Sequence, residues 1–135
     1  MTAPLLDTHA WIWWIFRDRR LGRPVIDALD ALPPSERPFL SDISLVEVAL
    51  LVGRGRLELS PPLEAWVEAA AHPRSVRNVA ISPAIAAKVA TLGETFRDPS
   101  DRVIVATSQF LGVPLLTRDK AIIRSRLVKR WTPDA

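Results

Sequence analysis

Hydrophobic residues recur along the chain in short blocks, separated by turns rich in proline, glycine and charged residues. The shortest blocks are typical of buried strands, and the longer ones have the periodicity or the caps of helices. The predicted strands are Leu5–Leu6, Pro38–Ser41, Val79–Ile81, Val113–Leu116 and an edge strand at Val128–Trp131. The predicted helices are Thr8–Phe16, Val25–Leu32, Ser44–Gly53, Pro62–Ala71, Pro83–Leu92, Pro99–Leu111 and a short helix from Asp119. Strands that alternate with helices predict an α/β fold with a mainly parallel central sheet.

The length of 135 residues predicts a single domain over 1–135 that folds without disulfides or structural zinc. The absence of cysteine excludes thiolate metal sites and a cysteine nucleophile. No secretory signal or membrane-length apolar stretch is visible, so we expect a cytoplasmic protein with no membrane partner. The net charge is only +3, with 15 Arg against 3 Lys, which permits a polyanionic partner without requiring one.

Four acidic residues stand where a predicted strand ends or a predicted helix begins: Asp7, Glu47, Asp101 and Asp119. Because function in a parallel sheet gathers beyond the carboxyl ends of the strands, we expect all four to face one crevice. Carboxylates about 5 Å apart repel by roughly 3 kcal/mol, which raises their pKa values unless a cation neutralises them. Oxygen ligands favour Mg²⁺ or Mn²⁺, and this combination supports phosphodiester hydrolysis by a metal-activated water.

Helix capping is the structural alternative for these acids, and for each acid taken singly it is the better explanation. Ser44 and Glu47 have the spacing of a capping box, and Asp98-Pro99 resembles a cap followed by proline at the first helical position. Asp7 fits capping least well, because Thr8 is able to cap the first helix without it.

Four motifs occur in order along the chain: Leu5-Leu6-Asp7-Thr8-His9-Ala10-Trp11, Ser44-Leu45-Val46-Glu47-Val48-Ala49, Arg97-Asp98-Pro99-Ser100-Asp101-Arg102 and Leu115-Leu116-Thr117-Arg118-Asp119. Together they resemble the PIN-domain family, and most closely the VapC-like toxins of type II toxin–antitoxin systems. The resemblance spans nearly the whole chain. It implies a three-layer α/β/α fold with a short, mainly parallel sheet. It also implies a magnesium-dependent endoribonuclease in which Mn²⁺ can substitute, an antitoxin partner and a homodimer.

The resemblance also implies roles for the acids. Asp7, Glu47 and Asp101 match the metal-binding acids, and Asp119 matches a fourth catalytic acid that organises the metal site or the attacking water. Asp98 matches an additional acid, which we place behind the metal ligands. The chain departs from its relatives at Val46, where Trp is frequent, and at Leu51, where Lys is frequent. The missing Lys puts a basic contact near the site in doubt.

Other polar candidates stand close to these acids. Thr8 and Thr117 are expected to hydrogen-bond to the acids beside them, although local capping explains them equally well. For His9 we expect a structural or capping role, because no second placed histidine supports a histidine mechanism. The candidate RNA contacts are Arg54, Arg56, Arg102 and Arg118, with a solvated surface as the alternative for each.

Large apolar side chains cover every face of the first predicted helix. The sheet can cover only one face, so the helix is either fully buried or covered by a partner. The candidate partner-binding residues are Trp11, Trp13, Trp14 and Phe16. Protein contact is favoured over stacking on RNA bases, which stays open.

Two rival functions remain at this point. A phosphoryl-receiver signalling domain has similar size and class, and Thr117 with Lys120 gives it a slight basis. Such a domain needs paired acids after its first strand, whereas Asp7 stands alone, and Asp42 has no convincing apolar run before it. The other rival is a catalytically silent RNA-binding member of the same fold.

Overall fold

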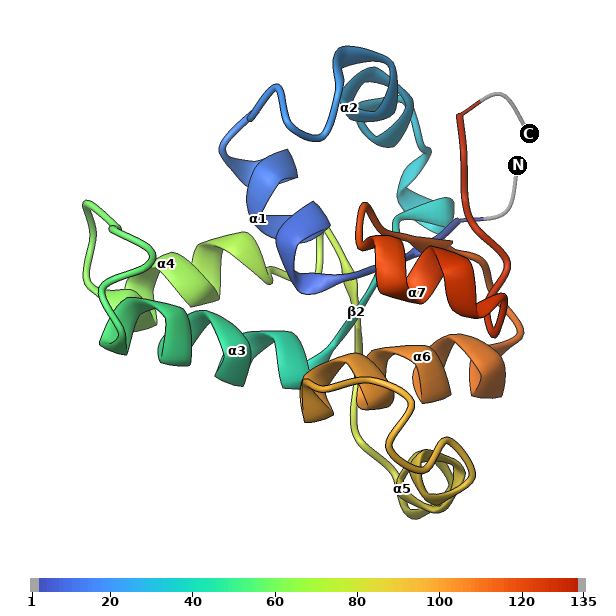
Figure 1. The fold of residues 1–135 in the computed structure, drawn as a ribbon. Helices are drawn as coiled ribbons and strands as arrows, with labels where there is room; N and C mark the ends of the chain where they lie inside the picture. The colour runs from blue at the N-terminus through green and yellow to red at the C-terminus, as the bar shows by residue number, and fades with distance from the viewer. Residues whose placement is uncertain (1–2, 134–135) are drawn as a thin grey trace.

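The computed structural model describes residues 3–133 and has a small parallel sheet at its centre (Figure 1). Its strands are β1 (Leu5–Leu6), β2 (Phe39–Ser41), β3 (Arg77–Val79) and β4 (Leu115–Leu116), paired in the order β3-β2-β1-β4. The helices are α1 (Thr8–Ile15), α2 (Arg23–Asp30), α3 (Asp42–Gly53), α4 (Leu63–Ala70), α5 (Pro83–Ala90), α6 (Pro99–Leu111) and α7 (Lys120–Ser125), with a 3-10 turn η1 (Pro34–Glu36). All the strand pairs are parallel, as the alternation of elements predicts.

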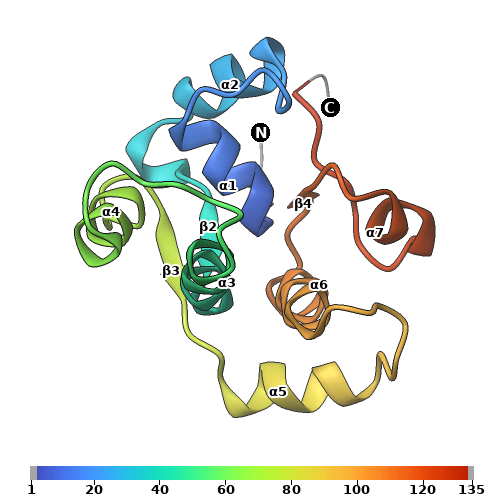
Figure 2. The same cartoon turned by 60° about the vertical axis from the view of Figure 1, so that its left-hand side comes forward.

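Helices cover both faces of the sheet, which gives the expected three layers (Figure 2). Side chains alternate across a strand, so neighbouring residues of β1 face opposite layers. Leu6 packs into a core with α1, α2, α3 and α4. Leu5 packs into a second core with α5, α6 and α7. Two apolar cores therefore hold the sheet between them.

The strand order places a crevice at the carboxyl end of β1. The chain runs outward from β1 through β2 to β3, and β4 then pairs on the other side of β1. In the register of the sheet, Leu5 of β1 lies opposite Phe39 of β2 on one side and Leu115 of β4 on the other. Loops leaving the central strands diverge at such a reversal, and ligands bind there in open α/β sheets.

Two predicted helix caps are wrong, and α2 begins at Arg23, two residues before the predicted Val25. Ser41 caps α3 by accepting a hydrogen bond from the Ile43 amide at 3.2 Å, so the helix begins before Ser44. Glu47 consequently lies beyond the first turn, and the capping box does not form. Asp7, not Thr8, caps α1 and accepts the Ala10 amide at 2.7 Å.

The sheet edges also differ from prediction. The observed β3 lies two residues before the predicted Val79–Ile81, because Arg77 pairs with Phe39 and its guanidinium lies 3.8 Å from the Phe39 ring centroid. The predicted edge strand Val128–Trp131 is reduced to one parallel bridge between Leu115 and Arg130.

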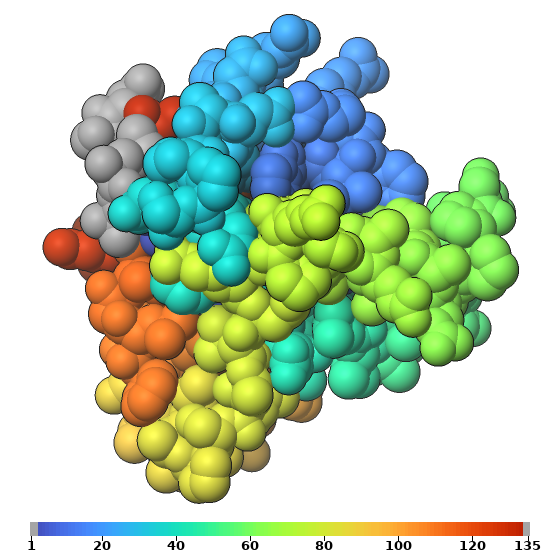
Figure 3. Space-filling view, turned by 180° about the vertical axis from the view of Figure 1, so that it is seen from behind, coloured from blue at the N-terminus to red at the C-terminus, as the bar shows by residue number. Residues whose placement is uncertain are grey.

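From behind, the segment around α4, β3 and α5 forms much of the surface beside α6 (Figure 3). Within residues 3–133, no helix has both the length and the apolar character needed to cross a bilayer.

Candidate active site

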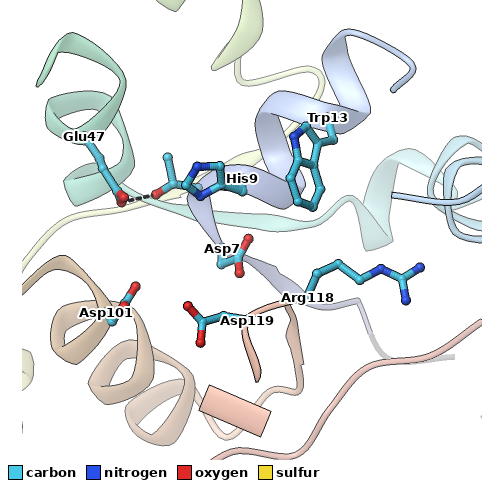
Figure 4. A pocket seen from close by; sticks show the side chains of 8 residues that line it. Asp7, His9, Trp13, Glu47, Asp101, Arg118 and Asp119 are labelled. Carbon is cyan, nitrogen blue, oxygen red and sulfur yellow. Dashed lines mark hydrogen bonds between the residues drawn. The ribbon is translucent and has the colours of Figure 1, made fainter. Parts of the chain in front are cut away.

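The predicted acids come together in one cavity of about 270 Å³ beyond β1 and β4, here called the acidic cavity. Its lining residues are Asp7, Thr8, His9, Trp13, Glu47, Asp101, Arg118 and Asp119. Asp7 precedes α1, Glu47 lies on α3, Asp101 on α6, and Asp119 precedes α7. In Figure 4 these acids approach the same space from separate segments of the chain. Parallel packing thus assembles residues that lie far apart in sequence.

Asp7 is held rigidly at the end of β1. One carboxylate oxygen accepts the Ala10 amide, and the other accepts a hydrogen bond from the Thr117 hydroxyl. Thr117 is itself fully buried beside β4. Helix capping and site geometry are therefore two uses of the same carboxylate, one for each oxygen.

Glu47 on α3 is oriented by a hydrogen bond from Thr8 on α1. The Thr8 hydroxyl donates to its Oε1 at 2.5 Å and lies 2.9 Å from the hydroxyl oxygen of buried Ser44. Both threonines do bond to acids, but Thr8 bonds to Glu47 and Thr117 to Asp7. Each threonine thus connects two segments of the chain, whereas the sequence suggested a hydrogen bond to the acid next to it.

Asp101 carries a carboxyl group with a strongly raised pKa. Its half-buried position raises its pKa to about 7, and the negative charges of Asp119, Asp98 and Glu47 add to the rise. No residue in the described range donates a hydrogen bond to its side chain. The group is therefore poised to exchange a proton or a cation near neutral pH.

Burial also raises the pKa values of Asp7 and Glu47. Hydrogen bonds from Thr117 and Thr8 oppose that rise, and neighbouring carboxylates add to it. The expected direction is confirmed, but desolvation is a larger cause than mutual repulsion. The ion pairs seen among residues 3–133 join Arg17–Asp30, Arg20–Asp18 and Arg23–Asp27, so none neutralises the acidic cavity.

The donor set suits a hard cation. All the acids present oxygen, and magnesium needs only one or two carboxylates because water supplies its other ligands. Across the described part of the chain, no three His, Cys, Asp or Glu side chains are close enough to enclose an ion by themselves. The residues thus fit a hydrated divalent cation better than a metal enclosed by protein ligands.

Asp98 and Asp119 both cap helices, as the sequence allowed. Asp98 accepts the Ser100 amide at 2.9 Å, with Pro99 at the first position of α6. Asp119 accepts the Ile122 amide at 3.1 Å through Oδ1. Asp98 is exposed and does not line the acidic cavity.

A second cavity of about 650 Å³, here called the basic groove, adjoins the acidic cavity. Its lining residues are His9, Ile12, Trp13, Arg20, Ile43, Val46, Glu47, Leu50, Leu51, Arg54, Arg56, Leu57, Asp98, Pro99 and Ser100. Predicted RNA contacts Arg54 and Arg56 are exposed in it. Leu51 also lines it. Arg20 was not anticipated, because its place in a run of charged residues gave no sign of the groove.

The other two candidate arginines are engaged with backbone. Arg118 lines the acidic cavity, but its guanidinium donates to the Leu21 carbonyl. Arg102 donates to the Phe96 carbonyl at 2.6 and 2.9 Å and lines neither cavity. The structure therefore does not bring Arg102 to the acids.

The aromatic residues of α1 divide into three environments. Trp11 is 0% exposed and its indole donates to the Ala70 carbonyl, so its predicted partner role is wrong. Phe16 is 46% exposed and stacks on Trp66. Trp14 donates to Asp30 at 3.0 Å. Trp13 and exposed His9 line both cavities, so His9 serves neither as a cap nor in the core.

A family model described as PIN domain matches residues 5–126. The chain belongs to the PIN-domain family. This PIN-domain protein is 34% identical over 123 residues to Ribonuclease VapC22 of Mycobacterium tuberculosis, covering 90% of this chain and 91% of the relative. The resemblance drawn from the four motifs is confirmed, and it excludes the phosphoryl-receiver alternative.

Solved structures show the same PIN fold. A toxin–antitoxin complex from Klebsiella pneumoniae superposes with a TM-score of 0.65 at 25% identity, covering 97% of this chain and 98% of that one. FitAcB from Neisseria gonorrhoeae gives 0.66 at 23% identity, with 96% of each chain covered. The latter likeness supports the fold alone.

Proposed function

We propose that this PIN-domain protein is a magnesium-dependent endoribonuclease and the toxin of a type II toxin–antitoxin pair. The observation that carries the proposal is the acidic cavity, where four carboxylates from four segments meet without an ion-paired arginine or lysine among the described residues. The similarity to a protein named Ribonuclease VapC22 supports RNA as substrate. The similarity to a toxin–antitoxin complex supports an antitoxin partner.

In this proposal Asp7 and Asp101 hold Mg²⁺ or Mn²⁺ directly, and Glu47 holds it directly or through a water molecule. When bound, the cation activates water for attack on the phosphodiester and neutralises developing negative charge. Asp7 is fixed by Ala10 and Thr117, so its carboxylate needs no reorganisation.

The other polar groups of the cavity orient the reactants. Thr8 fixes Glu47. Asp119 uses Oδ1 to cap α7, which leaves Oδ2 to accept a hydrogen bond from the attacking water.

Arginines at the end of α3 supply the positive charge that RNA needs near an acidic cavity. Arg54 and Arg56 are exposed in the basic groove, where they can hold phosphates flanking the scissile bond. Contact by Arg118 or Arg102 would require release of the Leu21 or Phe96 carbonyl, respectively.

The protein partners are an antitoxin and, in a homodimer, a second copy of this chain. Phe16 and Trp14 remain the candidate partner contacts on α1, because neither lines the acidic cavity or the basic groove. A large aromatic side chain that is half exposed is typical of interface hot spots.

The proposal is tested by cleavage of single-stranded RNA with purified protein freed of antitoxin. Cleavage should occur with Mg²⁺ or Mn²⁺ and stop when EDTA is added. Undiminished cleavage in EDTA would overturn the metal assignment. No cleavage under any divalent cation would favour the silent RNA-binding alternative.

A further inference from the structure

The acidic cavity and the basic groove share Trp13, His9 and Glu47. Trp13 is half-buried and His9 is exposed, so ring surface is accessible where the two cavities meet. In Figure 4 Trp13 and His9 lie above Asp7, on the opposite side from Asp119. A strand that occupies both cavities therefore has these rings within reach.

The Trp13 ring is held in place before any ligand arrives. The His9 ring centroid lies 5.7 Å away at an interplanar angle of 53°, and the Arg20 guanidinium lies 5.1 Å from the Trp13 ring. Arg20 is itself fixed by Asp18, which accepts from its Nη2 at 2.7 Å. A pre-ordered ring loses little conformational freedom when a planar group stacks on it.

We propose that Trp13, flanked by His9, stacks against an unpaired base of the nucleotide next to the scissile phosphate. The inference rests on the proposed function, because the scissile phosphate is placed by the acidic cavity. Aromatic and guanidinium surfaces that bind single-stranded RNA do so through base stacking, which tolerates any sequence. The subsite therefore selects unpaired strands over duplex, whose bases are already stacked within the helix.

Charge distribution favours a nucleic-acid strand over a protein segment at this position. Arg20, Arg54 and Arg56 line the groove that continues from Trp13, and such cations bind the phosphates of a nucleic-acid strand. The acids on the other side of Trp13 need a cation, and a phosphate completes its ligands. An antitoxin segment on Trp13 is the competing outcome of the test below.

The test is binding of fluorescein-labelled decamers, measured by anisotropy in an Asp101→Asn background with EDTA, so that cleavage does not interfere. One probe is oligoadenylate, and the other is an abasic decamer with the same number of phosphates. Trp13→Leu should weaken oligoadenylate binding about tenfold, or about 1.4 kcal/mol, and leave abasic binding unchanged. The salt dependence should not change, because stacking releases no counterions.

Trp13→Phe keeps an aromatic ring and should bind oligoadenylate within about threefold of the background protein. Phe110→Leu is the matched control, since Phe110 is 50% exposed and lines neither cavity. Equal loss for both probes, or no loss for either, would overturn the stacking subsite. Unchanged RNA binding with weakened antitoxin binding would assign Trp13 to the protein partner instead.

Failure of the nuclease proposal itself would look different. In that case Trp13→Leu would still weaken oligoadenylate binding, but the wild-type protein would not cut RNA in the presence of Mg²⁺. Absence of RNA binding by the background protein would overturn the subsite directly.

Discussion

The Thr8 hydroxyl on α1 donates a 2.5 Å hydrogen bond to Oε1 of Glu47 on α3, and so couples helix packing to the geometry of the acidic cavity. Thr8→Val keeps the side-chain shape but removes this bond and the contact to Ser44. We expect RNA cleavage to slow about tenfold and Tm to fall by about 4 °C, since about 1 kcal/mol of hydrogen bonding is lost.

Thr8→Ser is the control, because it restores the hydroxyl and should recover most of the rate. Turnover per folded molecule and Tm are measured together for both variants. A lower Tm with an unchanged turnover number would show that Thr8 stabilises the fold without orienting Glu47.

The raised pKa of Asp101 predicts that the metal-free protein loses stability as pH rises. The folded carboxyl holds its proton up to about pH 7, whereas the carboxyl in the unfolded chain releases it near its ordinary pKa of 3.8. Between these values the folded state binds more protons, so the free energy of unfolding decreases with increasing pH and levels off above about pH 7. Asp101→Asn should make this decrease smaller, and the raised pKa values of Asp7 and Glu47 account for what is left of it.

At pH 8 in EDTA, we expect Asp101→Asn to raise Tm by about 4 °C, because solvent screening limits the gain to about 1 kcal/mol. Added Mg²⁺ should then raise the Tm of the wild type more than that of the variant. Asp101 suits this test better than Asp7, whose carboxylate also accepts from Thr117 and Ala10. A variant less stable than wild type at every pH would contradict a destabilising carboxylate.

Asp98 and Asp7 both cap helices, but only Asp7 lines the acidic cavity. Asn preserves capping in each case. Asp98→Asn should therefore retain cleavage within about threefold, whereas Asp7→Asn should lose it about a hundredfold or more. The rates are measured on one labelled RNA at saturating Mg²⁺. An Asp98→Asn variant as inactive as Asp7→Asn would place Asp98 among the direct ligands.

The sequence predicted the alternating elements and the four acids because both depend on local patterns. Strands such as Leu5–Leu6 are short apolar runs, and parallel pairing follows from the helices between them. It also identified the PIN family, whose matched range of residues 5–126 contains all four acids. The sequence did not predict which side chains orient the acids, because those contacts join residues that are distant along the chain. Thr117, for example, donates a hydrogen bond to Asp7, which lies 110 positions away.

The sequence did not predict the helix caps correctly, and the reason is physical. Ser41, Ser44 and Thr8 are all good capping residues, and local sequence does not decide which one caps. Packing decides, because the Ser44 hydroxyl contacts the Thr8 hydroxyl, whereas the Ser41 hydroxyl accepts the Ile43 amide at the start of α3. The same limit applies to α1, where only the packed structure separates buried Trp11 from half-buried Trp13.

Phe16 is the exposed end of the aromatic face of α1, where it stacks on Trp66. Phe16→Ala should weaken antitoxin binding or dimerisation by about thirtyfold, the loss typical of an aromatic hot spot worth about 2 kcal/mol. RNA cleavage should persist, because Phe16 lines neither cavity. Isothermal titration and sedimentation measure the two associations. Unchanged affinity and unchanged oligomeric state would show that Phe16 is not an interface residue.

The convergence of carboxylates from four segments is most directly tested by single-turnover cleavage of a labelled single-stranded RNA across a Mg²⁺ titration. Wild-type protein should cleave with a rate that saturates with Mg²⁺. Asp101→Asn, which removes the carboxylate with a pKa of about 7, should cleave about a hundredfold more slowly at every concentration. Equal rates and equal Mg²⁺ dependence for the two proteins would contradict a catalytic site in the acidic cavity.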